Sequence, residues 1–293
     1  MESSISSRLA GLQGRLARPF WGGAGLWAVL CGALASGGLR WDGEALWTLL
    51  LVLLLTELGW GSLWDLLAGS RPLHCPPRQP AATPRPGARR WMPYTLPGSP
   101  AGRLFDGLGQ LAAWWRERFW PAAGGALLGS AAAVVLVLAL SLALPGTLRL
   151  LNAALVALVG LGLWQQRRGQ LPLLAGAVVQ VGLGWLAGHL AFAPMSGTSL
   201  LLALSFAVAV WGGMRLKLGL RGGAWLLDGG QVVVAAILAA LRQPLVAFTV
   251  GMLLLGQVAM QPGVDGEQVR EQVFRRTWPW LMVAMLMAAL ARP

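Results

Sequence analysis

Two carboxylates lie within an apolar stretch of the sequence, TELGWGSLWDLL, where an acidic residue is costly. Glu57 and Asp65 are eight residues apart. On a helix this spacing separates them by about 12 Å along the axis and about 80° around it, so both side chains are able to face one cavity. Because ionisable groups inside a membrane span are functional candidates, Glu57 and Asp65 are candidate metal ligands. The alternative interpretation makes Glu57 a protonated packing residue and Asp65 the mark of a helix end.

A basic cluster and a third acid follow in the second half of the chain. Arg215, Lys217 and Arg221 precede Asp228. Together with Arg71, these cations are candidates for binding an anion such as diphosphate, because charge-assisted hydrogen bonds to phosphate oxygens are strong. Arg221 also lies two helical turns before Asp228, and this spacing predicts a structural ion pair between them.

The remaining polar candidates carry weaker signals. His189 stands alone near the end of an apolar segment, which favours a hydrogen-bonded interfacial residue over a metal ligand. His74 and Cys75 are adjacent but lack a second pair of ligands, so they do not predict a metal site. The sequence has no P-loop, no dinucleotide-binding pattern and no credible Ser/His/Asp set.

The elements that position these residues follow from the composition. Of 293 residues, 56% are hydrophobic and 12% are charged, against about 25% charged in typical soluble domains. The 23 Lys and Arg residues exceed the 11 Asp and Glu residues, giving a net charge of +12. In a soluble protein this excess would suggest nucleic acid. Here it is typical of the loops that set membrane topology, so the bilayer, and no nucleic acid, is the expected partner.

Hydropathy predicts an all-α polytopic membrane protein with about nine transmembrane helices, each of roughly 17–25 apolar residues. A cytoplasmic segment, 1–18, precedes a single transmembrane domain, 19–293. The seventh segment contains Asp228, and the ninth is short. The nine predicted spans are 19–39, 45–68, 120–144, 148–165, 171–193, 196–214, 224–241, 243–260 and 277–291.

The arginines alternate between the predicted loops. The even-numbered loops, like the N-terminal segment, are rich in arginine, whereas the loops on the other side carry few cations. By the positive-inside rule, the N-terminus is cytoplasmic and the C-terminus lies on the opposite side of the cell (inner) membrane.

The long loop after the second span has two parts. Residues 70–100 are rich in proline, which predicts extended or irregular chain. Residues 101–118 place apolar side chains at helical spacing, which predicts an amphipathic helix on the cytoplasmic membrane surface, with Trp114, Trp115 and Trp120 as interfacial anchors. The alternative is that 101–118 simply extends the third span. Further tryptophans near predicted cytoplasmic helix ends are interpreted mainly as interfacial residues: Trp60, Trp64, Trp164, Trp211, Trp225, Trp278 and Trp280.

Two local patterns, together with nine spans, resemble the UbiA superfamily of intramembrane prenyltransferases, which includes chlorophyll synthases and 4-hydroxybenzoate prenyltransferases. In the family, an aspartate-rich motif after helix two is followed by RPL or RPI, and here WDLLAGS runs into Arg71–Pro72–Leu73. A KxGxR-like stretch precedes helix seven, and here Lys217–Leu218–Gly219–Leu220–Arg221 leads to Asp228. The resemblance implies a UbiA-like bundle with a cavity open to the cytoplasm.

The chain departs from that family at the metal ligands. The resemblance implies aspartates that hold Mg²⁺, which binds a prenyl diphosphate and stabilises it as it leaves. In the first motif only Asp65 and, less closely, Glu57 remain, and the second motif contains no carboxylate. Asp228 follows the KxGxR-like stretch and does not occupy a family metal position.

Three functions are therefore weighed. The first is a non-catalytic UbiA-like protein that binds an isoprenoid, quinone or pigment, or is packed shut, as an accessory or structural subunit of a membrane complex. The second is an active Mg²⁺-dependent prenyltransferase acting on an aromatic, macrocyclic or lipid acceptor. The third is a small-molecule transporter, although no inverted repeat is evident. The loss of the second motif favours the first.

Overall fold

The structure is a computed structural model that describes residues 23–67, 100–261 and 267–291. All regular structure in these residues is helical, which confirms the all-α prediction. The N-terminal segment 1–18, most of the proline-rich loop 70–100, and Arg71, His74 and Cys75 lie outside the described residues. In chain order the helices are α2 (Ala24–Ala35), α3 (Gly43–Leu54), η2 (Leu55–Gly61), α4 (Ser62–Leu67), α5 (Pro100–Trp114), η4 (Trp115–Phe119), α6 (Trp120–Ala143), α7 (Leu148–Arg167), α8 (Leu173–Ala177), η5 (Val178–Leu183), α9 (Gly184–Leu190), α10 (Gly197–Lys217), α11 (Gly223–Ala240), α12 (Pro244–Ala259) and α13 (Glu267–Leu290).

Within the described residues, five helical segments are long and apolar enough to cross a membrane, so the chain is a polytopic membrane protein. They are Gly43–Asp65, Leu148–Arg167, Leu173–Leu190, Gly197–Lys217 and Gly223–Ala240. Three shorter apolar helices are Ala24–Ala35, Leu127–Ala143 and Pro244–Ala259. Each of the nine predicted segments coincides with a helix or a run of helices, but the count of nine spans stays a prediction.

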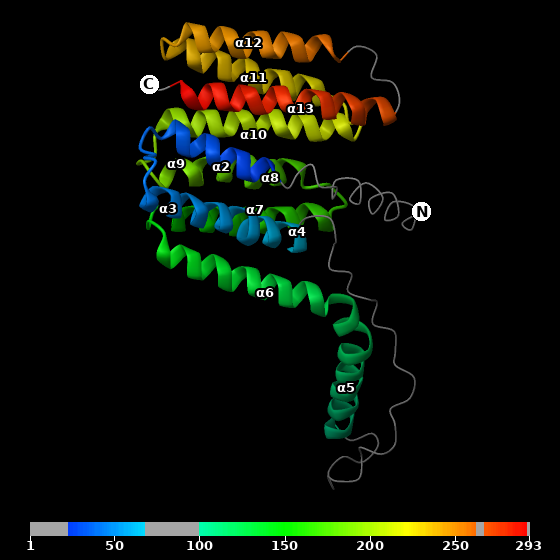
Figure 1. The fold of residues 1–293 in the computed structure, drawn as a ribbon. Helices are drawn as coiled ribbons and strands as arrows, with labels where there is room; N and C mark the ends of the chain where they lie inside the picture. Colours follow the sequence, from blue (N-terminus) through cyan, green and yellow to red (C-terminus); the bar gives the residue numbers. More distant parts are fainter. Residues whose placement is uncertain (1–22, 68–99, 262–266, 292–293) are drawn as a thin grey trace. The chain divides into compact units, whose positions relative to one another are not determined.

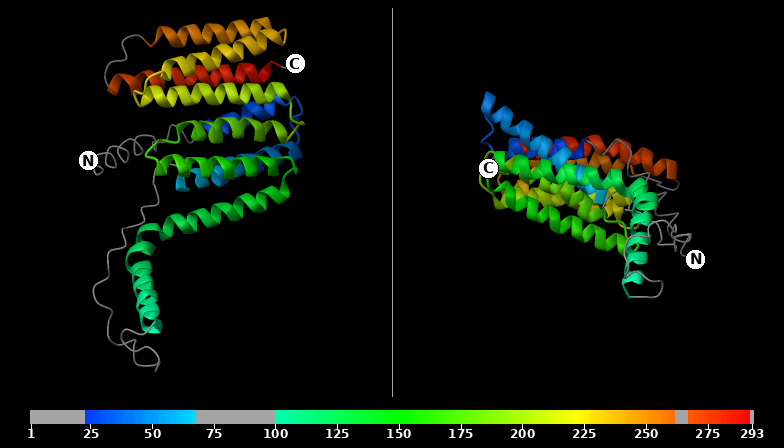
Figure 2. Two further views of the ribbon diagram at one scale, coloured as in Figure 1. Left: turned by 180° about the vertical axis from the view of Figure 1, so that it is seen from behind. Right: turned by 90° about the horizontal axis from the view of Figure 1, so that it is seen from below.

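The chain divides into two units, Met1–Pro72 with Ala132–Pro293, and Leu73–Ala131. In the first unit, α10 contacts α11 and α13 on one side and α8 and η5 on another (Figures 1 and 2). The closest helix pairs meet through glycine. A Cβ on Gly188 of α9 would lie 2.0 Å from the carbonyl oxygen of Val29 in α2, and a Cβ on Gly212 of α10 would lie 2.2 Å from the amide nitrogen of Leu227 in α11. Small residues of this kind let membrane helices approach closely.

In the second unit, the chain is helical from Pro100 through η4 into α6. The predicted helix over 101–118 is therefore present, and it continues into the predicted third span through a π-helical turn. Trp115 and Phe119 stack with ring centroids 4.4 Å apart, and Trp120 lies 6.4 Å from Trp115. Leu108, Leu111, Trp115 and Trp120 are all exposed, which agrees with an apolar face that nothing in the described part of this unit covers. That this face lies on a membrane stays a prediction.

Three segments of the described part of the chain are π-helical: η2, η4 and η5. A π-helical turn holds one more residue than an α-helical turn, and such turns occur often at functional sites. η2 interrupts the second predicted span and contains Glu57, and η5 interrupts the fifth. Because η2 and η5 contact each other and both contact α2, three separate membrane segments meet at this level of the first unit.

Candidate functional site: a carboxylate where two π-helical segments meet α2

Glu57 reaches from η2 to the N-terminal turn of α2. Its Oε1 accepts a hydrogen bond from the backbone N–H of Leu26 at 2.6 Å. Leu26 is the third residue of α2, so its N–H is one of those that the helix itself leaves without a partner. The partial positive charge at a helix N-terminus also attracts a carboxylate. Glu57 therefore caps α2 from another span. The alternative interpretation, a protonated packing residue, did not include this partner.

Gly25 makes this approach possible. A Cβ at Gly25 would lie 2.8 Å from Glu57 Oε1 and 3.5 Å from the backbone oxygen of Gln180 in η5. Any larger residue at Gly25 would push the carboxylate away from Leu26. Because both atoms lie close to the Cβ position of Gly25, the Glu57 carboxylate and the backbone carbonyl of Gln180 lie on the same side of α2.

Gln180 adds a polar side chain to η5, with an amide oxygen that accepts and an amide nitrogen that donates. The side-chain oxygen Oε1 of Gln180 is buried and has no hydrogen-bond partner among the described residues. Glu57 Oε2 has no hydrogen bond there either, since the contact of Glu57 runs through Oε1. Gln180 was not among the residues predicted from the sequence. The sequence marks it only as a single amide side chain within the apolar run AGAVVQVGLG.

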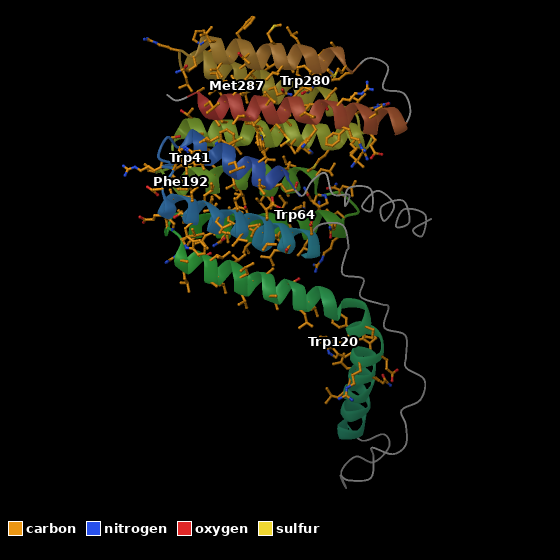
Figure 3. All side chains as sticks on the ribbon, viewed as in Figure 1. Trp41, Trp64, Trp120, Phe192, Trp280 and Met287 are labelled. Carbon is orange, nitrogen blue, oxygen red and sulfur yellow. The ribbon has the colours of Figure 1, made fainter. Side chains whose placement is uncertain are left out.

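Two tryptophans that follow Glu57 in the chain, Trp60 and Trp64, are buried in the bundle. Trp60 of η2 donates from Nε1 to Asn152 Oδ1 of α7 at 2.8 Å, and Asn152 Nδ2 donates to Ser141 Oγ of α6 at 2.6 Å. Trp64 of α4 packs on Gly176 of α8, where a Cβ would lie 3.2 Å from Cζ2 (Figure 3). Trp60 is 1% exposed and Trp64 is 5% exposed. Both therefore pack inside the bundle, and their depth relative to the membrane interface stays a prediction.

The predicted metal pair of Glu57 and Asp65 does not form a metal centre in the described residues. Asp65 is exposed in α4, and nothing described there binds it. In the described residues no group of three or more His, Cys, Asp or Glu side chains converges. Mg²⁺ needs near-octahedral oxygen coordination, and one carboxylate already bonded to Leu26 does not supply it. The residues present do not fit the two-metal site that the family resemblance implies.

The structure brings three of the four predicted anion ligands, Arg215, Lys217 and Arg221, into one turn between α10 and α11. Gly219 and Gly222 have φ of +69° and +76°, values that glycine adopts readily. Arg215 Nη2 donates to the Arg221 carbonyl at 2.7 Å, so part of its guanidinium closes the turn. Arg221 is exposed, and Lys217 Nζ lies 5.7 Å from the Phe274 ring centroid. The fourth, Arg71, lies outside the described residues.

Asp228 takes different partners from the predicted one. Its Oδ1 accepts from Gln261 Nε2 at 3.0 Å and from Gln257 Nε2 at 3.4 Å. Gln257 Oε1 in turn accepts from Gln231 Nε2 at 3.1 Å. Among the ion pairs of the described residues, none joins Asp228 to Arg221, and the two glutamines take the place of the predicted pair. The sequence analysis missed these glutamines, which lie 26 to 33 residues from their partners.

His189 lies in α9 and forms a hydrogen bond inside the bundle. His189 Nε2 lies 3.1 Å from the carbonyl oxygen of Pro194. His189 is hydrogen-bonded, as predicted, and it is buried, with 4% of its surface exposed.

Comparison of the chain with protein-family models, curated proteins and solved structures gives no match. In the described residues, the meeting of η2, η5 and α2 therefore provides a carboxylate bonded to Leu26 and, on η5, a buried amide oxygen without a partner.

Proposed function

We propose that this protein is a UbiA-like integral membrane protein that binds an isoprenoid-, quinone- or pigment-type ligand and serves as an accessory or structural subunit of a membrane complex. The observation that carries the proposal is the position of Glu57. Of the two acidic residues that remain in the family-like first motif, Glu57 is bonded to α2, and no group of three or more His, Cys, Asp or Glu side chains converges in the described residues. This arrangement supports binding rather than ionisation of a prenyl diphosphate.

The chemistry of prenyl transfer explains why the missing carboxylates matter. A leaving diphosphate develops charge that must be neutralised as the allylic bond breaks, and metal ions are the usual means. The basic turn with Arg215, Lys217 and Arg221 supplies positive charge but no oxygen ligands, and Arg215 is partly engaged by the Arg221 carbonyl. Such a turn is able to hold an anion without catalysing its departure.

The proposed topology has nine spans with a cytoplasmic N-terminus and a C-terminus on the opposite side of the inner membrane. The alternation of arginines along the loops supports this topology. It places the basic turn between α10 and α11 at the cytoplasmic surface, where partners and anionic headgroups are accessible.

Diphosphate release and bound lipid together test the proposal. The full chain is purified into lipid nanodiscs and incubated with geranylgeranyl diphosphate and Mg²⁺, and diphosphate release is compared with that of empty nanodiscs. We expect no Mg²⁺-dependent release, and we expect an isoprenoid-tailed molecule in the organic extract, identified by mass spectrometry. Copurifying subunits in mild detergent would identify the membrane complex.

The matched control is the double variant Glu57→Gln with Asp65→Asn. Sustained release that this variant abolishes would make the protein an active prenyltransferase and contradict the proposal. Ligand movement across sealed proteoliposomes would support a transporter instead.

A further inference from the structure

We propose that the turn between α10 and α11 binds the head group of an anionic phospholipid, through the exposed guanidinium of Arg221 beside the exposed apolar side chains of Leu220 and Trp225. This inference goes beyond the proposed function, because it concerns a lipid at the outer surface of the bundle rather than a ligand inside it. It holds or fails whether or not the protein is an enzyme.

The first step is the level of this turn in the bilayer. The helices on either side of it, Gly197–Lys217 and Gly223–Ala240, are each long and apolar enough to cross a membrane. The turn itself consists of Leu218–Gly222. Because so short a connection keeps the ends of both spans together, it lies at the boundary between hydrocarbon and water, which is the level of the lipid phosphates.

The second step is the charge of the turn. Arg215 Nη2 donates to the backbone carbonyl of Arg221 at 2.7 Å, so a second guanidinium lies against the backbone of Arg221. The Arg221 side chain is exposed and forms no ion pair among the described residues. The sequence from Pro194 to Leu227 contains no Asp or Glu, and Asp228 already accepts from two glutamine amides. No carboxylate close in sequence therefore neutralises the turn.

The third step is the apolar surface next to Arg221. Leu220 is 41% exposed and Trp225 is 85% exposed. Tryptophan is enriched at membrane interfaces, where its ring lies at the level of the head groups. A phospholipid matches both features, since its phosphate pairs with a guanidinium while its glycerol and upper acyl chain contact the apolar side chains. A small soluble anion would use Arg221 and gain nothing from Leu220 or Trp225.

The test measures the lipid selectivity of the full chain, purified in detergent. Native mass spectrometry compares dioleoylphosphatidylglycerol with dioleoylphosphatidylethanolamine, which has the same acyl chains and phosphate but carries an ammonium group. We expect the unaltered protein to bind phosphatidylglycerol more tightly. The attraction of one basic residue to anionic lipid predicts that Arg221→Gln binds phosphatidylglycerol about fivefold more weakly, with phosphatidylethanolamine unchanged. The backbone carbonyl that Arg215 binds is kept in this variant, so the turn should stay folded.

The matched control is Arg40→Gln, which removes the same charge from another exposed arginine. Arg40 lies in the loop between α2 and α3, and that loop is at the other end of the bundle from the α10–α11 turn (Figure 1). Its loss should leave the affinity for phosphatidylglycerol unchanged. Equal weakening by both variants would mean that net charge attracts the lipid and would overturn the inference. Equal affinity of the unaltered protein for the two lipids would overturn it as well.

Trp225→Ala distinguishes a lipid from a soluble anion. The ring is 85% exposed, so its removal should leave the fold intact. We expect phosphatidylglycerol to bind this variant several-fold more weakly, because the lipid loses apolar contact. Inorganic pyrophosphate is the second probe. If pyrophosphate binds through Arg221 and Trp225→Ala leaves the affinity for phosphatidylglycerol unchanged, the turn is a site for free anions and the inference fails. Neither result alters the measurements of diphosphate release and bound isoprenoid that test the proposed function.

Discussion

Glu57 and Asp228 are both partly buried carboxylates in membrane segments, yet the molecule treats them differently. Asp228 lies in the regular α-helix α11 and receives two side-chain amides, from Gln257 in α12 and from Gln261 just after it. Glu57 lies in the π-helical segment η2 and receives one backbone N–H from Leu26. Asp228 is held by two side-chain donors on one oxygen and Glu57 by one backbone donor on one oxygen, and in the described residues neither carboxylate has a hydrogen bond on its other oxygen.

The difference lies in how each carboxylate is connected to the helices around it. In the Asp228 network, each amide donates toward the carboxylate: Gln231 to Gln257, and Gln257 to Asp228. Such a chain fixes α11 against α12 and leaves one amide oxygen, Gln231 Oε1, without a partner in the described residues. At the Glu57 junction, the π-helical segments η2 and η5 both contact α2. The polar side chains of Glu57 and Gln180 form no such chain of hydrogen bonds in the described residues.

Breaking the Asp228 network should have the largest effect on stability. Gln257→Leu removes the amide that links Gln231 to Asp228, and Gln257 is fully buried. Because two groups lose a partner, we expect a loss of about 2–3 kcal/mol in the free energy of unfolding. The measurement is reversible unfolding in mixed detergent micelles. A loss below about 0.5 kcal/mol would contradict the role of Gln257 as the link between Gln231 and Asp228.

Forcing the Glu57 cap open should have the next largest effect. Gly25→Ala places a Cβ 2.8 Å from Glu57 Oε1, so the carboxylate must move away from Leu26. We expect a loss of about 1 kcal/mol, from the lost cap, because the flexible end of the Glu57 side chain moves aside and relieves the contact itself. Thermal unfolding in nanodiscs checks it. The control is Gly251→Ala in α12, where a Cβ would meet nothing within 4 Å, and which should be neutral or stabilising. Equal destabilisation by both would contradict the close approach at Gly25.

The sequence predicts the apolar segments well because burial in lipid demands long apolar helices whatever their packing. It also points to Glu57, because an intramembrane carboxylate stands out against its neighbours. It does not reveal the π-helical turns, which arise where packing accommodates one extra residue and carry no composition of their own. It therefore does not reveal that Glu57 meets Leu26 and Gln180.

Asp228 illustrates a second limit. Its seven-residue spacing from Arg221 suggested a local ion pair, because spacing along one helix is all that a sequence displays directly. The actual partners lie 29 and 33 residues further on, across a turn between α11 and α12. Glutamine carries no charge and is tolerated in membrane helices, so neither partner stood out. Which helix faces which is decided by close contacts such as Gly212 against Leu227, and these appear only in three dimensions.

Trimming the outer part of the Asp228 network should have a smaller effect. Gln261→Leu removes one hydrogen bond of 3.0 Å to a carboxylate that is only partly buried. Interhelical hydrogen bonds in membrane proteins contribute about 0.6 kcal/mol on average, so we expect a loss of up to about 1 kcal/mol. The Gln257→Leu variant, unfolded under the same conditions, is the reference. A larger loss from Gln261→Leu than from Gln257→Leu would place the centre of the network at the outer residue.

Glu57→Gln should have the smallest effect on stability, and this near-absence of effect is the sharpest test of the comparison. The amide oxygen still caps Leu26, so the free energy of unfolding should change by less than about 0.5 kcal/mol. Asp228→Asn, its counterpart, weakens two bonds that converge on one oxygen and should cost about 1 kcal/mol. Unfolding of both variants side by side gives the comparison. If Glu57→Gln destabilises more than Asp228→Asn, the single bond to Leu26 contributes more to stability than the two bonds to Asp228, and the order assigned to the two regions must be exchanged.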